Sequence, residues 1–277
     1  MLINALVTKH GDLGAPKAKL RYLVVQGPLA AEAKPGQFVH IRVSAAFDPL
    51  LRRPISIAAI DRARDEIMLC FRVQGRGTEL LAQTKAGAML SILGPLGNGF
   101  SLPRSGELVL VAGGIGAFPL YALAQAALAA EVPVRLLWGG ENAEFLANAG
   151  LAHWRRLDLP LHLATLDGSL GRRGLVTEAW PEYLGLRGRG AGLEDQRVSV
   201  AACGPAGMLK DLSRRCGEAG IALEVSLEER MGCALGACLG CVCTLRGKDG
   251  SIRRAKVCSD GPVFQGQEVV WDAETGE

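Results

Sequence analysis

The sequence predicts a protein of mixed β and α/β class, built from three consecutive parts. Short strand-like runs separated by glycine or proline fill residues 1–103, with almost no helical periodicity, and this is typical of a small antiparallel β-barrel. Over residues 104–225 strand-like and helical stretches alternate, which predicts a parallel sheet covered by helices. Residues 226–277 hold most of the cysteines and are too few to bury a core of their own.

Composition excludes several classes of protein. Of the 277 residues, 49% are hydrophobic and 21% charged, which excludes general disorder. The 31 Lys and Arg against 28 Asp and Glu leave a net charge of +3, too balanced for nucleic acid or an anionic membrane to be the main partner. The first residues lack a basic stretch followed by an apolar one, so we expect no export signal and a cytoplasmic location. Cysteines in such a protein indicate metal or redox chemistry rather than disulfides.

One uncharged run, residues 108–130, is long enough to span a membrane. Glycines and a proline interrupt it, however. The better interpretation is a buried strand over Leu108–Ala112, a glycine turn, and a helix over Pro119–Ala130. We therefore expect no membrane segment here.

The strands of the barrel can be placed from their apolar runs. They are Leu20–Gln26, Gln37–Val43, Ile55–Ile60, Ile67–Val73 and Met89–Leu93. A second set of strand-like runs lies in the middle part, over residues 104–225. Each of these runs is followed by a helical stretch, and one of the helices follows Pro205.

The cysteine spacing is the most specific signal in the chain. Cys233, Cys238 and Cys241 give C-x4-C-x2-C, and 16 residues (242–257) separate Cys241 from Cys258. This is the spacing of plant-type [2Fe–2S] proteins and predicts these four cysteines as iron ligands. A structural zinc site is the alternative, but such sites usually pair two short C-x2–4-C motifs. Cys243 is expected to face away, as a small apolar residue.

Small residues surround the first three cysteines. Three thiolates within nine residues have to point at one cluster, which requires a tightly wrapped backbone. Glycine allows positive φ, and small side chains leave backbone N–H groups free to donate to sulfur. The small residues in question are Gly232, Ala234, Gly236, Ala237 and Gly240.

Two short motifs in the first part suggest phosphate binding, and a third is a less specific glycine turn. Arg52 and Arg53 precede Pro54-Ile55-Ser56, and an arginine can pair with a diphosphate. Gly75-Arg76-Gly77-Thr78 precedes an apparent helix, Glu79–Gln83, where backbone N–H groups and a threonine cap would form an anion site. A third glycine turn, GPLGNGF from Gly94, is either a domain-linking loop or part of a site.

Two turns in the second part lie where nucleotides bind in α/β proteins. Gly113, Gly114 and Gly116 end a strand and begin a helix, as a dinucleotide loop requires, although their spacing is not G-x-G-x-x-G. Cys203-Gly204-Pro205 follows a later strand of the same sheet. Ligands bind at the carboxyl ends of such strands, so both turns are candidate nucleotide contacts.

Taken together and in order, these motifs resemble the electron-transfer subunits of NAD-dependent (class 1B) dihydroorotate dehydrogenases. The resemblance covers nearly the whole chain and implies a ferredoxin-reductase-like fold with an FAD-binding barrel (1–103), an NAD-binding domain (104–225) and a [2Fe–2S] domain (226–277). The stretches that carry it are RPIS from Arg53, GPLGNGF from Gly94, VAGGIGAFPL from Val111, CGPAGMLK from Cys203, and EERMGCALGACLGC with VCSDGPVF from Glu228 onward.

The resemblance also implies roles for individual residues. Arg53, Pro54, Ile55 and Ser56 would line the flavin and its diphosphate, and Gly77 with Thr78 would hold the diphosphate. Cys70, Phe71 and Arg72 would run beside the flavin, and the four cysteines named above would ligate iron. The sequence departs from the pattern at Ile55, where the wider superfamily has an aromatic residue although this subfamily also uses isoleucine, and in a longer loop at Gly185–Gly192.

The function implied is that of a subunit in pyrimidine (UMP) biosynthesis. An FMN-containing partner, in a heterotetramer of two of each chain, would oxidise dihydroorotate, and electrons would pass through the cluster and FAD to NAD+ as a diffusible co-substrate. The four histidines are scattered and no catalytic constellation stands out, so the base for dihydroorotate oxidation is expected on the partner. Two alternatives are a subunit of another FAD/[2Fe–2S] complex, of ferredoxin:NADP or hydrogenase type, and a zinc-stabilised binding module without enzyme activity.

Overall fold

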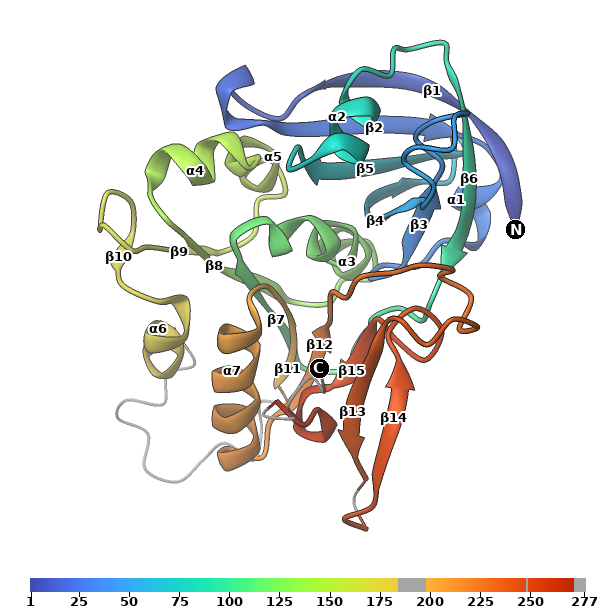
Figure 1. Cartoon of the computed structure of the whole chain (residues 1–277). Helices are drawn as coiled ribbons and strands as arrows, with labels where there is room; N and C mark the ends of the chain where they lie inside the picture. Colours follow the sequence, from blue (N-terminus) through green and yellow to red (C-terminus); the bar gives the residue numbers. More distant parts are fainter. Residues whose placement is uncertain (184–197, 248, 272–277) are drawn as a thin grey trace.

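The computed structural model describes residues 1–183, 198–247 and 249–271 (Figure 1). A β-barrel, an α/β sheet and a C-terminal hairpin follow one another along these residues. The loop at Gly185–Gly192 lies outside the described residues. No helix within the described ranges is long and apolar enough to cross a membrane.

The first part is a closed barrel of six strands in the order β1-β2-β5-β4-β3-β6, with every neighbouring pair antiparallel. The predicted strands are all present, with ends shifted by a few residues. The sequence pattern did not indicate β1, which buries only Ala5 and Val7 completely. The barrel elements are β1 (Leu2–Asp12), η1 (Pro16–Ala18), β2 (Leu20–Gln26), α1 (Leu29–Glu32), β3 (Phe38–Ile41), β4 (Arg53–Asp61), β5 (Glu66–Arg72), α2 (Arg76–Ala82) and β6 (Met89–Leu96).

The second part is a seven-stranded sheet in the order β10-β9-β8-β7-β11-β12-β15. Its first six strands are parallel, as the sequence predicts, and β15 adds an antiparallel edge from the C-terminal part. The elements are β7 (Glu107–Gly113), η2 (Gly114–Gly116), α3 (Ala117–Ala129), β8 (Val134–Gly140), α4 (Ala143–Asn148), α5 (Leu151–Arg155), β9 (Leu161–Thr165), β10 (Arg172–Arg173), α6 (Val176–Tyr183), β11 (Val198–Cys203), α7 (Ala206–Glu218) and β12 (Ala222–Ser226).

The uncharged run at 108–130 is strand β7 followed by helix α3. Both faces of β7 are buried, which explains why it carries no polar alternation. Leu110 and its alternate neighbours pack on the side of α3, whereas Val109 and Val111 pack with α6, α7 and the C-terminal part. The interpretation of this run as a buried strand and helix is confirmed.

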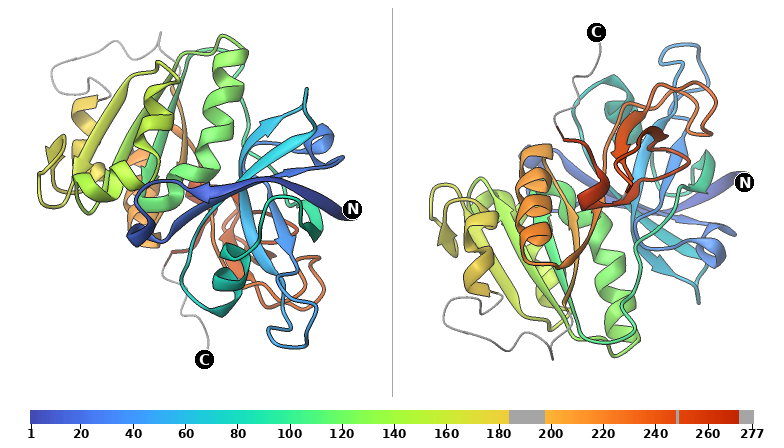
Figure 2. Two further views of the ribbon diagram at one scale, coloured as in Figure 1. Left: turned by 90° about the horizontal axis from the view of Figure 1, so that it is seen from above. Right: turned by 90° about the horizontal axis from the view of Figure 1, so that it is seen from below.

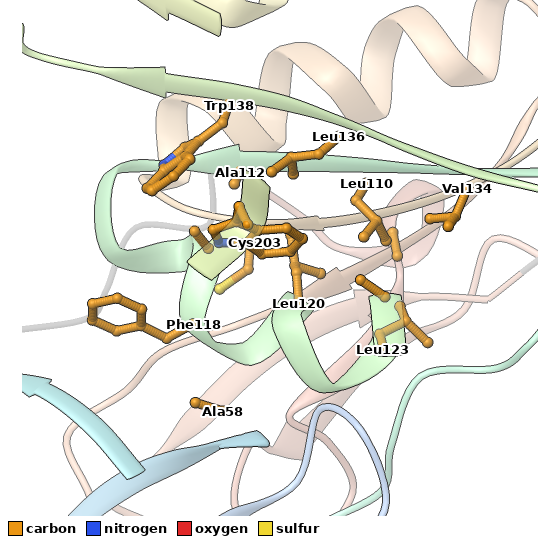
Figure 3. Close-up of a cluster of buried hydrophobic side chains, with 14 of the residues drawn as sticks. Ala58, Leu110, Ala112, Phe118, Leu120, Leu123, Val134, Leu136, Trp138 and Cys203 are labelled. Atoms are coloured by element: carbon orange, nitrogen blue, oxygen red, sulfur yellow. The ribbon is translucent and has the colours of Figure 1, made fainter. Parts of the chain in front are cut away.

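Helix α3 is packed on two sides. In Figure 3, Phe118 lies on the side of α3 nearer Ala58 of barrel strand β4, whereas Leu120 lies on the side nearer sheet residues such as Leu110. These side chains belong to one buried cluster that continues from the barrel into the sheet. The helix therefore fixes the barrel relative to the sheet.

The C-terminal part lies across the other two. Its hairpin consists of β13 (Val242–Arg246) and β14 (Ile252–Lys256), and the chain then returns to the sheet as β15 (Val263–Gln265) and ends in η4 (Gly266–Glu268). Viewed from below, this part lies between the barrel and the sheet (Figure 2).

Asn98, in the GPLGNGF turn, ties the C-terminal part to the end of the barrel. Its side-chain amide donates to the carbonyls of Asp260 and Val263, at 3.2 and 2.9 Å, and its Oδ1 accepts from the amide of Val263 at 3.0 Å. Gly97 is needed beside it, because a Cβ there would lie 2.5 Å from the carbonyl oxygen of Gly261. The turn is thus a link between distant segments.

We expect Asn98→Ala to loosen the segment that follows Cys258. Loss of three side-chain hydrogen bonds would reduce its stability by about 1–3 kcal/mol. Faster hydrogen exchange at the amide of Val263 measures this. Asn4→Ala, at an exposed position on β1, is the control, and equal exchange in the two variants would contradict the proposed link.

Candidate functional site

A cavity of about 710 Å³ lies at the carboxyl ends of β7, β8 and β11; we call it the sheet cavity. This is where α/β sheets bind their ligands. Five of the six predicted nucleotide contacts line it: Gly113, Gly114, Gly116, Gly204 and Pro205. Cys203, the sixth predicted contact, does not line the cavity, because its side chain is buried. The same burial raises the pKa of its thiol.

The glycines of this cavity are required by close backbone approach. A Cβ on Gly116 would lie 2.2 Å from the carbonyl oxygen of Cys203, so the two turns could not meet with any larger residue. Gly114 has φ +57°, and its carbonyl accepts a 2.9 Å hydrogen bond from the indole of Trp138. The loop between β7 and α3 is therefore held open beside the end of β11.

A second cavity, of about 240 Å³, lies on the outside of the barrel; we call it the barrel cavity. Seven residues expected to contact FAD line it: Pro54, Ile55, Ser56, Cys70, Phe71, Arg72 and Thr78. Burial raises the pKa of the Cys70 thiol, so this cysteine is an apolar wall rather than a nucleophile.

Arg53 and Gly77 do not line this cavity but lie in contact with each other. A Cβ on Gly77 would lie 2.2 Å from Nε of Arg53, so only glycine lets the guanidinium pack on the start of α2. The Arg53 guanidinium donates only to the nearby carbonyls of Leu51 and Arg52 within the described residues. Its remaining N–H groups suit an anionic group, as a diphosphate-binding role requires.

Arg52 is placed differently. Its guanidinium donates to the carbonyl of Ser91 at 2.8 Å, to Oγ of Ser91 at 3.0 Å and to the carbonyl of His40 at 3.3 Å. These bonds join β6 and β3 at the rim of the barrel. Arg52 is therefore bound to the barrel itself, whereas Arg53 is available to a ligand.

Thr78 is not the helix cap that the sequence suggested. Helix α2 begins at Arg76 with Gly75 as its N-cap, so Thr78 is the third residue of its first turn. Its hydroxyl accepts from the amides of Gln74 and Gly75 and donates to the carbonyl of Gly75. It shapes the turn before the helix.

Sequence reasoning missed the segment that leads from β12 to the cysteines. Leu227, Glu228, Glu229 and Met231 line the barrel cavity, together with Ser226 at the end of β12. The available signal was position: the segment begins at the carboxyl end of a parallel strand.

Three residues line both cavities: Arg72, Ile115 and Glu228. Each comes from a different part of the fold, namely β5 of the barrel, the loop after β7, and the segment before the cysteines. The Arg72 guanidinium lies 5.4 Å from the centroid of the Phe145 ring, a cation–π contact that directs it across the junction. Ligands in the two cavities would therefore touch at this junction.

The cysteines expected to bind iron lie in two pairs. The amide of Cys238 donates to Sγ of Cys233 at 3.4 Å, and the amide of Cys258 donates to Sγ of Cys241 at 3.4 Å. Cys241 and Cys258 are each 1% exposed, whereas Cys238 is on the surface. In the described part of the chain, no three His, Cys, Asp or Glu side chains gather as ligands of a single metal ion. A [2Fe–2S] cluster shares four thiolates between two irons.

Backbone N–H groups point at these sulfurs. Donation from the amides of Leu235 and Cys238 lowers the pKa of Cys233 to about 6, which favours the thiolate. Burial, with Cys241 close by, raises the pKa of Cys258 to about 11. This donor set fits an iron–sulfur cluster, whose properties depend on such hydrogen bonds.

The expectation about glycines in this loop is only partly right. Gly236 has positive φ, but the other left-handed positions are Ala234 and Leu239, at +57° and +58°. Gly232 instead leaves room for sulfur, because a Cβ there would lie 3.3 Å from Sγ of Cys238; at Gly240 the distance would be 3.6 Å, an ordinary contact.

Cys243 lies on β13, opposite Ala255 of β14. It is half-buried, and burial raises its pKa to about 11. It packs with the apolar cluster on the α7 side of the sheet. None of the hydrogen bonds to cysteine sulfur given above involves it.

Comparisons with known proteins place the chain. Residues 228–270 match the family model described as the iron–sulfur cluster binding domain of dihydroorotate dehydrogenase B, and residues 110–214 match that of the oxidoreductase NAD-binding domain. Among solved structures, the NADH-dependent reduced ferredoxin-NADP oxidoreductase is similar with a TM-score of 0.80 and 27% identity, over 98% of this chain and 91% of that one. A ferredoxin NADP+ reductase from Neisseria gonorrhoeae, 19% identical, shares the fold with a TM-score of 0.64, over 82% of this chain and 99% of that one.

Two relatives are similar over nearly their full length. The dihydroorotate dehydrogenase B (NAD(+)) electron transfer subunit of Desulforamulus reducens is 40% identical, covering 91% of this chain and 92% of its own. The subunit of the same name from Geobacillus thermodenitrificans is 42% identical, covering 90% and 91%. With its barrel, its NAD-binding sheet and its cysteine loop in the same order, the chain belongs to the family of dihydroorotate dehydrogenase B (NAD(+)) electron transfer subunits.

Proposed function

We propose that this chain carries electrons from a dihydroorotate-oxidising partner to NAD+, through a [2Fe–2S] cluster and FAD, in pyrimidine biosynthesis. The observation that supports this most is the junction at Arg72, Ile115 and Glu228, where both cavities meet next to the cysteine loop. Bound FAD exchanges a hydride with NAD+ and single electrons with a cluster, so it links the two kinds of transfer.

The barrel holds the flavin in this proposal. Pro54, Ile55, Ser56, Cys70 and Phe71 form the wall of the barrel cavity. Arg53, packed on Gly77, supplies charge-assisted hydrogen bonds to the diphosphate. Arg72 contacts both ligands because it lines both cavities.

The sheet holds the nicotinamide nucleotide. The loop Gly113–Gly116 presents backbone N–H groups to the diphosphate, and Gly204 with Pro205 lines the same cavity. Cys203 contributes through its backbone, whose carbonyl sets the approach of Gly116. At Gly114 a Cβ would meet only the ring of Phe145, at 3.9 Å, so a larger side chain there would enter the space left for the ligand.

The four paired cysteines hold the cluster, with Cys233 and Cys238 on one iron and Cys241 and Cys258 on the other. The contacts within each pair support this division. Cys238 is exposed and Cys233 half-buried, so this pair lies nearer the surface, whereas Cys241 and Cys258 are buried in the body of the chain.

The partner is an FMN-containing catalytic subunit, in an assembly of two of each chain in the cytoplasm. Exposed apolar side chains around the cluster loop support a docking surface there, since Leu235 is 61% and Leu239 is 65% exposed. A partner seated on this loop would bring its own cofactor close to Cys233 and Cys238. The oxidation of dihydroorotate itself takes place on the partner.

Replacing a ligand and its neighbour separately tests the cluster. We expect Cys241→Ser to lose or severely weaken the cluster, because one iron would lack a thiolate. Cys243→Ser, two residues away, is the matched control and should keep full iron content. Iron analysis and visible absorption measure both. Equal iron loss in the two variants would mean that the third ligand is wrongly assigned.

A second prediction concerns flavin retention. A charge-assisted contact of Arg53 contributes about 1.5–3 kcal/mol, so Arg53→Ala should weaken FAD binding by roughly ten- to a hundred-fold. Fluorescence titration of the flavin-free protein measures the dissociation constant. Arg64→Ala, an exposed arginine paired with Asp61, is the control and should bind FAD normally. An unchanged affinity in Arg53→Ala would remove this residue from the site.

A third prediction separates the two half-reactions. Alone, the chain should oxidise NADH with a dye as acceptor, and it should show no reduction by dihydroorotate until the partner is added. Leu235→Glu or Leu239→Glu should abolish dihydroorotate-dependent NAD+ reduction by the complex while sparing NADH–dye activity. Leu2→Glu, at a position 63% exposed on β1, is the control.

Two results would count against this division. If the chain alone is reduced by dihydroorotate, it is not merely a carrier subunit. If both activities fall together in the leucine variants, these residues support the site rather than the docking surface.

A further inference from the structure

Glu228 occupies a place that the proposed electron path does not explain. It is one of the three residues that line both cavities, so its carboxyl group lies between the sites assigned to nicotinamide and flavin. It also follows Ser226, the last residue of β12, by two positions, and precedes the first cysteine by five. No other acidic residue among the described residues lines both cavities.

The carboxyl group can reach water and yet is set among apolar neighbours. Glu228 is exposed in the ligand-free chain, because both cavities open next to it. It makes no ion pair within the described residues, and desolvation raises its pKa above that of an ordinary glutamate. Leu227 and Met231 beside it and Ile115 opposite supply the apolar surroundings. Bound ligands in the two cavities would cover it further.

Few other charged or titratable groups face it. Arg72, the last residue of β5, lies on the other side of the junction. Glu229, next to Glu228 in the sequence, lines the barrel cavity. Asp211 of α7 lines the sheet cavity but is paired with Arg214 and Arg215, and the thiol of Cys203 at the end of β11 is kept neutral by burial. Glu141 lines only the sheet cavity and Glu229 only the barrel cavity, so Glu228 is the one carboxyl group among the described residues that lines both.

The chemistry of the proposed path needs a proton at this place. A cluster delivers electrons singly and without protons, whereas NAD+ accepts a hydride, which is two electrons and one proton. The flavin therefore has to take up one proton together with two electrons before it can release a hydride. The sum is two electrons, one proton and NAD+ giving NADH, with the proton coming from water.

We propose that Glu228 carries this proton: its carboxylic acid gives a proton to the flavin as electrons arrive from the cluster, and water then reprotonates the carboxylate. The inference rests on the proposed function and adds a general acid to it. A carboxyl group with one side toward the flavin and another toward solvent can give a proton to the flavin and then take up another from water. Hydride transfer between flavin and nicotinamide requires no such group.

The test uses the complex with its partner and the variant Glu228→Gln, which keeps the size and hydrogen bonding but cannot carry the proton. Reduction of FAD by dihydroorotate, without NAD+, should slow by roughly a hundred-fold, as expected for loss of a general acid. Reduction of FAD by NADH in the same sample should stay within about twofold of the wild type. Glu131→Gln, an exposed residue after α3, is the matched control for loss of one charge.

The pH dependence of the rate of FAD reduction distinguishes a proton donor from a residue with a purely structural role. The donor works in its acid form, so the wild-type rate of FAD reduction by dihydroorotate should fall as pH rises through the carboxyl pKa. This decline should be absent in Glu228→Gln. Glu228→Asp should recover part of the rate, and added acetate should partly restore Glu228→Ala by supplying a small carboxylic acid.

An equilibrium measurement completes the test without turnover. An ionised Glu228 beside the flavin disfavours electron uptake, so Glu228→Gln should raise the midpoint potential of bound FAD at pH values above the carboxyl pKa. Spectroelectrochemical titration measures this shift, and Glu131→Gln should leave the potential unchanged.

Four outcomes overturn the proposal: an unchanged rate with dihydroorotate, an equal fall with NADH, loss of FAD from Glu228→Gln, or an unchanged potential. The second would make Glu228 a nucleotide-positioning residue, and the third a flavin-holding one. If instead the wild-type complex fails to reduce FAD with dihydroorotate, the proposed function itself is wrong, and this result is distinguishable from the other four.

Discussion

The double burial of helix α3 is the interaction on which the site depends. The helix packs on the barrel through Phe118 and on the sheet through Leu120, within one continuous apolar cluster. Ile115, in the turn η2 that leads into this helix, lines both cavities, and Phe118 and Pro119 of the helix line the barrel cavity. A shift of α3 would therefore move the nucleotide loop and the flavin wall together. Because apolar packing of this kind tolerates little change in volume, the relative position of the two cavities is well determined.

Much of the fold could be predicted from local patterns in the sequence. Strand periodicity located the barrel strands from β2 onward, and the uncharged run gave β7 and α3, because a strand buried on both faces has no polar alternation to confuse the pattern. Strand β1 could not be predicted, because few of its residues are buried and its apolar pattern is therefore weak. The return of the chain as β15 also could not be predicted, since three residues at the edge of a sheet carry too little pattern.

The site was predictable where a motif fixes backbone geometry and unpredictable where distant segments meet. The glycines at Gly113–Gly116 line their cavity as expected, because their role follows from the turn itself. Only the family resemblance favoured Arg53 over Arg52 as the flavin contact. The physical difference lies in the contacts of Arg52 with Ser91, which is 39 positions away. Glu228 and Ile115 were likewise invisible, since their shared position arises only when three parts of the fold converge.

The pairing of β15 with β12 bears on how this architecture can be shortened or recombined. The C-terminal part is not an appendage, because it completes the sheet with hydrogen bonds along Glu224–Ser226. Removing it would leave β12 as an open edge with unpaired backbone groups, which invites association with other chains. A version of this chain without its cysteine loop would thus need a new edge strand or a cover for the old one. Loss or exchange of the iron-binding segment is constrained by the sheet as well as by its chemistry.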